Sequence, residues 1–321
     1  MVDQKITQLT ALTTPALDDL LAIVDDPSGT PETKKIAISN LLINENDFAS
    51  NSQTQGATQR SIKTYVGDID GWRTLGLSGV TVTRQSTDNP TVVLRFNADV
   101  TDYIWKGTRI KATENSIVHY FIVNADPSFS GGNTDVTCLS EIDISTPTQA
   151  ENLIGTGTIS AVAYAPPKTY PKGFPVAKRS WTFSSSSSSD TDEANPTTNT
   201  WYNYHSAAVP IGDWETDYHV FLLARVASGT NVRHKATLST GESSETDSRF
   251  TTVYQNDNYP GDANTATSGC GQSHIQKALI SLASKTTLYV NAMKFTAGTY
   301  GQLRVLGSAQ PTVIRATSTL L

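Results

Sequence analysis

Cysteine is scarce in this sequence, and its two copies, Cys138 and Cys270, lie far apart. Neither belongs to a CxxC pair or to a spacing typical of zinc ligands, so we expect neither a disulfide framework nor a structural metal. Both thiols are predicted to be free and mostly buried.

Long apolar runs and basic clusters are missing too. No stretch approaches the roughly 20 apolar residues that span a bilayer. The opening MVDQKITQLT lacks the basic and apolar regions of a signal peptide, so we expect a soluble protein made in a cytoplasm. The formal net charge is -6, and no Lys/Arg cluster interleaves with aromatic residues, which argues against nucleic-acid binding.

The motifs of several enzyme classes are absent, including GxSxG, the P-loop, a strand-and-helix GxGxxG and HExxH. Asp25 and Asp26 precede PSG, which favours a turn over paired catalytic acids. Cys270 lies four residues before His274, a spacing that would allow a thiol nucleophile and a base, but no motif surrounds them. The sequence therefore predicts no enzyme, no cofactor and no metal.

The composition favours β structure. Hydrophobic residues make up 37% and charged residues 17%, while Ser, Thr, Asn and Gly are plentiful. A chain of 321 residues is long enough for two or three compact units, each with its own core.

Near the N-terminus, LLAIV (20–24) and KKIAI (34–38) flank the turn-forming DDPSGTPE, which predicts a β-hairpin. We expect Leu20, Ile23, Ile36 and Ile38 to form one apolar surface. A two-stranded hairpin is marginal alone in water, so this surface should pack against copies of itself or a partner.

Farther along, apolar residues at near-helical spacing predict a short helix over residues 57–66, with Gly67 as a stop. The apolar positions are Ala57, Ile62, Tyr65 and Val66.

These segments carry a family resemblance. KITQLTALTTPALDDLLAIVD (5–25), followed by TKKI and NLL, resembles the N-terminal docking segment of many tail and head fibre proteins of tailed bacteriophages. ASNSQTQGATQRSIKTYV (49–66) resembles the element that often comes next and leads into a trimeric stem. The resemblance implies a virion location, a fibre-like role and threefold assembly.

The same resemblance implies that the N-terminus docks onto other virion proteins of the tail, the portal adaptor or the capsid. The residues expected to make this contact are Ile6, Leu9, Leu12, Pro15, Leu20, Ile23, Val24, Ile36, Ile38 and Leu41.

Beyond Gly71 the sequence alternates between strand-like runs and turn residues. Six runs precede the proline-rich YAPPKTYPKGFPVAKRS (164–180), which we interpret as a semi-rigid connector. Within them, WKGTRIKATENSIVHYFIV (105–123) resembles a module of phage fibre and head-decoration proteins. Nine runs follow, and the polar SSSSSSDTDEANPTTNT (184–200) between two of them is predicted to be a solvated loop.

The predicted fold is therefore mainly β, with the docking hairpin and short helix followed by two antiparallel β-sandwich or jelly-roll-like modules, in a homotrimer. The predicted segments are 1–46 for docking, 47–70 for a helical linker, 71–175 for a first sandwich or barrel, and 176–321 for a C-terminal sandwich.

Aromatic residues beside Asn and Asp suit sugar stacking and hydrogen bonding, and they gather in the C-terminal segment. Alternation along a strand would instead place many of them in the core. The candidate glycan-binding residues are Tyr254, Tyr259, Asn256, Asp257, Trp201 and Trp214.

The leading hypothesis is a trimeric tail fibre or spike, assembled in the cytoplasm of a bacterial host, whose C-terminal sandwich contacts a host-surface glycan. The alternative is a head fibre, a capsid decoration protein or an adaptor that carries another receptor-binding protein. A capsule-degrading hydrolase is a third hypothesis, which the sequence disfavours because it contains no paired carboxylates within a supporting motif.

Overall fold

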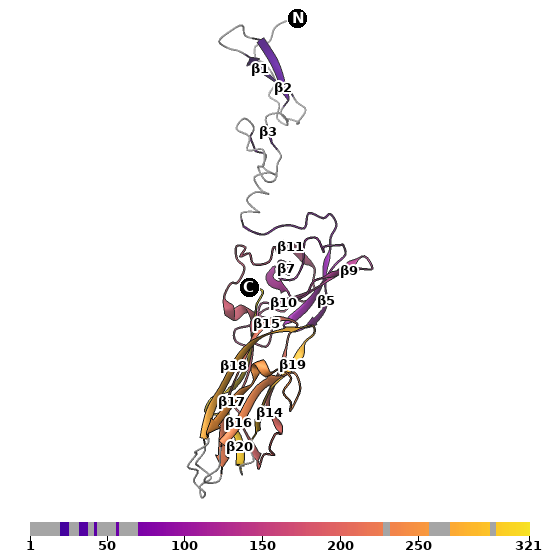
Figure 1. Cartoon of the computed structure of the whole chain (residues 1–321). Coiled ribbons are helices and arrows are strands. Elements are labelled where there is room, and N and C mark those ends of the chain that lie inside the picture. Colours follow the sequence, from indigo (N-terminus) through magenta and orange to yellow (C-terminus); the bar gives the residue numbers. More distant parts are fainter. Residues whose placement is uncertain are drawn as a thin grey trace. The chain divides into compact units, whose positions relative to one another are not determined.

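The computed structural model describes four short strands near the N-terminus and, beyond them, residues 70–226, 232–256, 270–295 and 300–321. Its contacts divide the chain into two compact units, Met1–Trp72 and Arg73–Leu321. Figure 1 labels strands of both units. The described chain is built from β-strands and short 3-10 helices, so the predicted β class is confirmed.

The N-terminal unit contains the predicted hairpin. Strands β1 (Leu20–Asp25) and β2 (Glu32–Ala37) pair antiparallel, with Leu21 opposite Ile36 and Ile23 opposite Lys34. The hairpin is thus confirmed at the level of the backbone, and its shared apolar surface stays a prediction. Among the predicted docking residues, those outside the described part of the chain are Ile6, Leu9, Leu12, Pro15, Ile38 and Leu41.

Two further short strands, β3 (Leu42–Ile43) and β4 (Gly56–Ala57), pair in parallel. The predicted helix over 57–66 begins at a residue that instead belongs to β4, and the rest of it lies outside the described residues.

The second unit begins with a seven-stranded antiparallel sheet, in the order β11-β7-β8-β10-β6-β5, with β9 added onto β10. Its strands are β5 (Val82–Asp88), β6 (Thr91–Phe96), β7 (Arg109–Glu114), β8 (Ile117–Val123), β9 (Ser128–Ser130), β10 (Asn133–Ser140) and β11 (Ile159–Ala165).

The core of this sheet follows from the period of two along each strand, which places every second side chain on the same face. Leu94 and Phe96 of β6, Ile110 of β7, Phe121 of β8 and Val136 of β10 are fully buried in one cluster. The six runs predicted from alternation coincide with β5–β8, β10 and β11, and the three-residue β9 was not predicted.

The proline-rich connector packs upon itself where the chain leaves this sheet. The Phe174 ring stacks on Trp181, with ring centroids 5.2 Å apart. The Trp181 indole N–H donates to the Pro175 carbonyl at 2.7 Å. Trp181 ends the 3-10 helix η3 (Lys178–Trp181), directly before the first strand of the next module.

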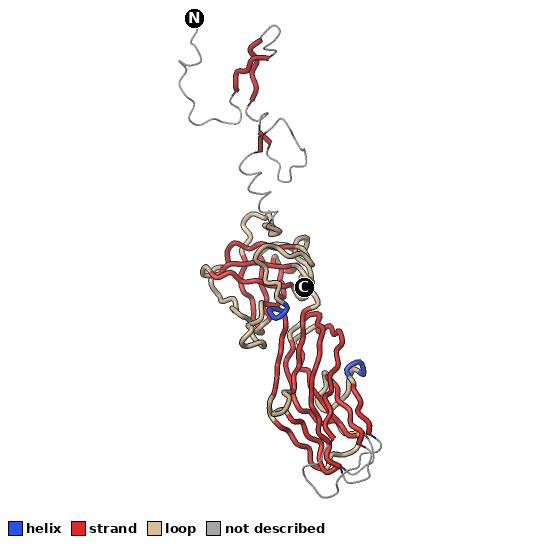
Figure 2. The backbone as a smooth tube through the Cα atoms, turned by 90° about the vertical axis from the view of Figure 1, so that its left-hand side faces the viewer, coloured by secondary structure: helices blue, strands red, loops and turns tan. Residues whose placement is uncertain are grey.

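The remaining strands form a sandwich of two antiparallel sheets, which Figure 2 shows from the side. One sheet has the order β12-β21-β15-β20-β13 with β18 added onto β15, and the other has the order β14-β19-β16-β17. The strands are β12 (Thr182–Ser187), β13 (Asp190–Ala194), β14 (Trp201–Val209), β15 (Gly212–Val226), β16 (Val232–Ser239), β17 (Thr252–Asn256), β18 (Cys270–Leu282), β19 (Thr286–Lys294), β20 (Tyr300–Leu306) and β21 (Thr312–Ser318).

Strand β15 organises the sandwich. It pairs with β18 along one edge and with β21 and then β20 along the other. Its inward residues Trp214, Tyr218 and Val220 are buried. The Tyr218 hydroxyl lies 2.9 Å from the carbonyls of both Ala236 and Phe250, so this tyrosine joins the two sheets by hydrogen bonding as well as by packing.

The stretch 184–200 is solvent-exposed over most of its length, as predicted, but the predicted loop is wrong for the part up to Ala194, which is mostly strand. Ser184 to Ser187 continue β12, and Asp190 to Ala194 form β13, which pairs with β20. Low apolar content did not prevent strand formation, because backbone pairing and the ion pairs of Asp190 and Asp192 with Arg304 stabilise this edge.

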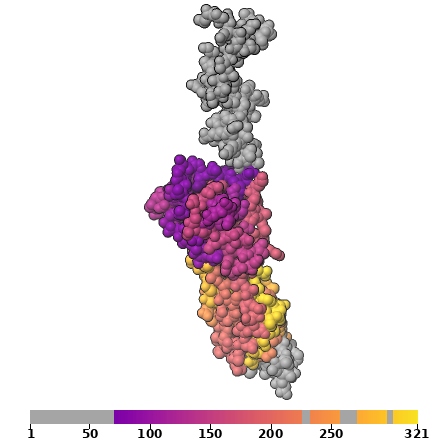
Figure 3. Space-filling view, turned by 180° about the vertical axis from the view of Figure 1, so that it is seen from behind, coloured from indigo at the N-terminus to yellow at the C-terminus, as the bar shows by residue number. Residues whose placement is uncertain are grey.

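Polar contacts join the first sheet to the sandwich, and Figure 3 shows these two parts of the second unit in contact. The Lys285 ammonium donates to the backbone carbonyls of Asp88 and Asn89 at 2.7 and 3.0 Å. Lys106 forms an ion pair of 2.8 Å with Asp213.

Candidate functional site

A cleft lies between the ends of β16 and β18, which belong to different sheets of the sandwich. Its volume is about 270 Å³, and the 3-10 helix η4 (Ser248–Phe250), with the loop before it, forms one wall. The lining residues are Leu238, Ser239, Thr240, Thr246, Asp247, Arg249, Phe250, Ile280, Ser281, Leu282 and Leu288.

The floor of the cleft is mainly aliphatic. Leu238 of β16 and Leu288 of β19 are buried, while Ile280 and Leu282 of β18 are half-buried. Phe250 is only 3% exposed, so its ring closes the floor and offers little of its face to a ligand. This part of the cleft can therefore receive a small apolar group.

The loop that follows β16 forms a rim of hydroxyl groups. The Thr240 hydroxyl and backbone N–H both donate to the Thr246 hydroxyl oxygen, at 3.2 and 3.0 Å. The Asn291 side-chain amide, which is fully buried, donates to the carbonyls of Gly241 and Ser244 at 2.9 and 2.8 Å. These bonds hold the rim in one conformation.

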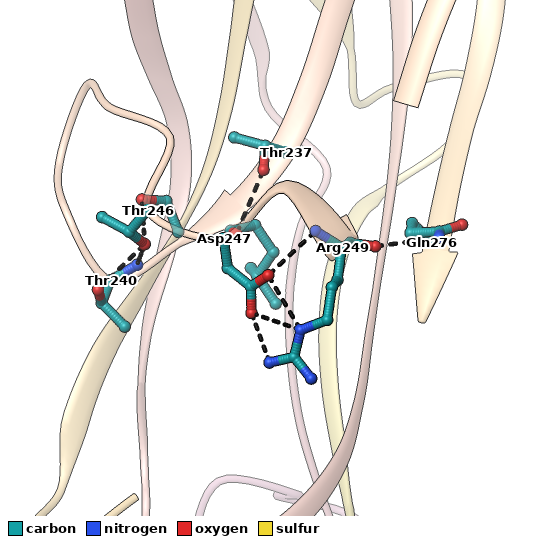
Figure 4. Close-up of polar contacts among 8 residues, drawn as sticks. Thr237, Thr240, Thr246, Asp247, Arg249 and Gln276 are labelled. Carbon is teal, nitrogen blue, oxygen red and sulfur yellow. Dashed lines mark hydrogen bonds and ion pairs between the residues drawn. The ribbon is translucent and has the colours of Figure 1, made fainter. Parts of the chain in front are cut away.

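An acid and a base complete the rim, as Figure 4 shows. Asp247 is the N-cap residue of η4 and accepts the backbone N–H of Arg249 at 3.0 Å. The Arg249 guanidinium donates to both oxygens of the same carboxylate, through Nε at 3.0 Å and Nη2 at 2.6 Å. This bonding holds the pKa of Asp247 below its ordinary value, so the carboxylate stays ionised.

Further hydrogen bonds tie η4 to both sheets. Gln276 of β18 donates to the Arg249 carbonyl at 3.0 Å. The Thr251 hydroxyl contacts Thr237 of β16 at 3.2 Å and Glu245 at 2.7 Å. These bonds fix the backbone of η4 against the sandwich, while Asp247 alone among the residues named here holds the Arg249 side chain.

Chemically, the cleft combines an aliphatic floor with hydroxyl and guanidinium groups that can exchange hydrogen bonds with a polar ligand. Within the described ranges, no group of three or more His, Cys, Asp and Glu residues is placed to hold a metal ion. The arrangement fits reversible binding of a small, partly apolar molecule.

The sequence-predicted glycan residues lie elsewhere. Trp214 is 1% exposed, and its indole N–H donates to the Pro210 carbonyl at 2.8 Å. Contrary to the prediction, Trp214 is thus not accessible to a glycan, because it occupies an inward position of β15.

Trp201, Tyr254 and Asn256 are half-buried, and none of them lines the cleft. The Tyr254 ring stacks on His234 with centroids 5.0 Å apart. Asp257 and Tyr259 lie outside the described residues.

Two histidines that look isolated in the sequence meet inside the sandwich. His234 Nδ1 of β16 lies 3.0 Å from His274 Nε2 of β18, and His274 Nδ1 lies 2.7 Å from the Thr252 hydroxyl. Burial lowers the pKa of His234 to about 3 and that of His274 to about 4. His274 thus takes part in a buried neutral pair; the side chain of Cys270, its suggested partner, is outside the described part.

The other thiol and two further histidines occupy structural positions. Cys138 is free and fully buried, as expected. His119 is buried in the first sheet, and its Nδ1 lies 3.0 Å from the Asn152 carbonyl. His219 lies on the outer face of its sheet, 3.0 Å from the Pro311 carbonyl.

Sequence reasoning missed the cleft residues. Asp247 and Arg249 lie in GESSETDSRF, which contains no binding motif. The one local signal is an Asp two residues before the Arg, a pattern that suits a capped turn. The contacts of this turn with β16 and β18 depend on the tertiary fold.

None of the helices in the described part of the chain has the length and apolar content needed to cross a membrane.

No protein-family model matches this chain, and no curated protein matches it. Among solved structures, the infectious bursal disease virus Gx strain is 10% identical with a TM-score of 0.24, over 75% of this chain and 78% of that chain. Dimeric latent PorU from Porphyromonas gingivalis is 12% identical with a TM-score of 0.26, over 76% of this chain and 25% of that chain.

An isomalto-dextranase of Arthrobacter globiformis T6, complexed with panose, is 11% identical with a TM-score of 0.19, over 74% of this chain and 36% of that chain. At TM-scores this low, these similarities carry no argument about function.

Proposed function

We propose that this chain is a non-enzymatic structural protein of a bacteriophage virion, a trimeric tail fibre or spike whose N-terminal segment docks on the particle. Its C-terminal sandwich contacts a glycan on the host surface. The observation that carries the proposal is the antiparallel pairing of β1 with β2 within the segment that resembles fibre docking elements.

The architecture of the second unit supports a display role. The described residues from 70 onward form antiparallel sheets that rest on one another through packed side chains and ion pairs. Such sheets make a rigid scaffold on which a binding cleft keeps its shape. The cleft beside η4 is a candidate for the glycan contact, because its rim carries hydroxyl groups and an arginine.

Two acidic residues of β13 also support a structural role. Asp190 and Asp192 both pair with Arg304, at 2.7 and 3.0 Å. Hydrogen bonds from Ser308 and Arg304 lower the pKa of Asp190. Its carboxylate therefore favours the ionised form, whereas a general acid must be protonated.

Docking is tested by complementation of a virus that lacks this gene. The full chain and a chain without residues 1–43 are supplied in trans, and purified particles are probed with antibody against the sandwich. We expect the full chain on the particles and the shortened chain only in the lysate, with both chains equally soluble. Equal incorporation of the two chains would refute N-terminal docking.

Trimer formation is tested separately by light scattering of the purified full chain. The expected mass is three times that of one chain. A monomer at micromolar concentration would contradict the proposed assembly.

A further inference from the structure

We propose that the cleft beside η4 binds a methyl-bearing sugar of a cell-surface glycan, either a 6-deoxyhexose or an N-acetylhexosamine. This inference rests on the proposed attachment function and names both its site and its ligand class. The cleft is not among the positions that the sequence singles out.

Size sets the first limit on the ligand. The cleft measures about 270 Å³, just below the roughly 300 Å³ at which pockets for drug-sized molecules begin. One sugar residue of a longer chain is a suitable occupant, with the neighbouring residues of the glycan outside the mouth.

The floor sets the second limit. Sugars often bind by laying a ring face on an exposed aromatic side chain, but Phe250, the one aromatic residue that lines the cleft, is almost fully buried. The floor instead presents Ile280 and Leu282 from β18. Aliphatic surface of this extent matches a methyl group, whose burial is favourable and needs no ring stacking.

The rim supplies the polar half of the recognition. Arg249 is 61% exposed at its side chain, and its bonds to Asp247 use Nε and Nη2. A guanidinium has five N–H groups, so several remain to donate to sugar hydroxyl oxygens. The Thr240 hydroxyl donates to Thr246 and keeps its lone pairs, so it can accept from a sugar hydroxyl.

Asp247 acts as a positioning residue in this arrangement. Its two oxygens hold the guanidinium plane through three contacts and cap η4 at the same time. The guanidinium is therefore oriented before a ligand arrives, which reduces the entropy lost on binding.

The experiment uses the purified full chain and saturation-transfer NMR with paired sugars. N-acetylglucosamine is compared with glucose, fucose with galactose, and rhamnose with mannose. We expect at least one methyl-bearing member to bind at least tenfold more tightly than its counterpart. If no methyl-bearing sugar shows saturation transfer, or if none binds more tightly than its counterpart, the inference is overturned.

Two variants locate the binding site. Arg249→Gln should weaken binding of the preferred sugar at least tenfold, whereas Asp247→Asn should weaken it less, because the guanidinium remains. The matched control is Arg315→Gln, which breaks a similar exposed ion pair with Asp217 outside the cleft and should leave binding unchanged. All variants should keep the wild-type melting temperature within a few degrees.

The outcomes separate this inference from the proposed function. Unchanged sugar binding in Arg249→Gln would refute the cleft as the glycan site and would not bear on the proposed attachment function. Absence of the chain from virus particles would refute the attachment function, whichever sugar the cleft binds.

Discussion

Acidification should weaken this fold through its two buried histidines. His234 and His274 are hydrogen bonded to each other, and His274 also to Thr252, so this short chain of bonds holds one proton between the two rings. An additional proton on the pair would be buried without a counter-charge among these partners. In the native state both rings are therefore neutral at pH values where free histidine is protonated.

The sign and size of the change in unfolding free energy follow from the linkage between proton binding and folding. In the unfolded chain each histidine titrates near 6.5, whereas the folded pKa is about 3 for His234 and about 4 for His274. The unfolded state binds more protons between these limits, so the free energy of unfolding falls as the pH drops below 6.5. At pH 5 the loss is about 2 kcal/mol for each histidine relative to pH 8.

The assay is urea unfolding at pH 7 and pH 5. For His274→Gln, the fall in unfolding free energy between these pH values should be about 2 kcal/mol smaller than for the wild type, whatever its absolute stability. The control is Val290→Ala, which destabilises the same core without a titrating group and should keep the wild-type pH dependence. An equal fall in His274→Gln and wild type would refute the reasoning.

Two further predictions concern the first sheet. Glu114→Ala should lower the free energy of unfolding by about 2 to 4 kcal/mol, because the buried Glu114 carboxylate accepts two backbone N–H groups of the loop at 155–157. Thermal unfolding of this variant is compared with that of Glu242→Ala, which removes an exposed carboxylate. Equal melting temperatures of the two variants would contradict the prediction. In the Cys270→Ser protein, Cys138 should resist a thiol reagent in the native state and react only on unfolding. Burial raises the pKa of the Cys138 thiol well above its ordinary value and excludes the reagent. Rapid labelling of the native protein would contradict this prediction, because it would show that the core of the first sheet opens.

Alternation of apolar and polar residues located most strands of the second unit. The runs TVVLRFN and TTLYVNAMKF correspond to β6 and β19. They were recognisable because their inward positions carry aliphatic side chains at a period of two. Strand β13 was missed because DTDEA has almost no apolar residue. Its strand state depends on pairing with β20, which lies more than a hundred residues later.

The candidate site was predicted less well than the fold. Aromatic content pointed to Trp214, but the phase of β15 turns this side chain inward. The cleft instead depends on a short capped turn meeting the end of β18, a contact between distant segments that local patterns do not encode. The buried histidine pair was hidden for the same reason, because its members lie forty residues apart.

The central claim is tested most directly by immunogold electron microscopy of particles of the virus that encodes this chain, with antibody raised against the C-terminal sandwich. A tail fibre or spike predicts gold at the tail, with label lost from particles grown without the gene. Gold on the capsid would contradict the tail assignment and favour a head fibre, and unlabelled particles would contradict a virion role altogether.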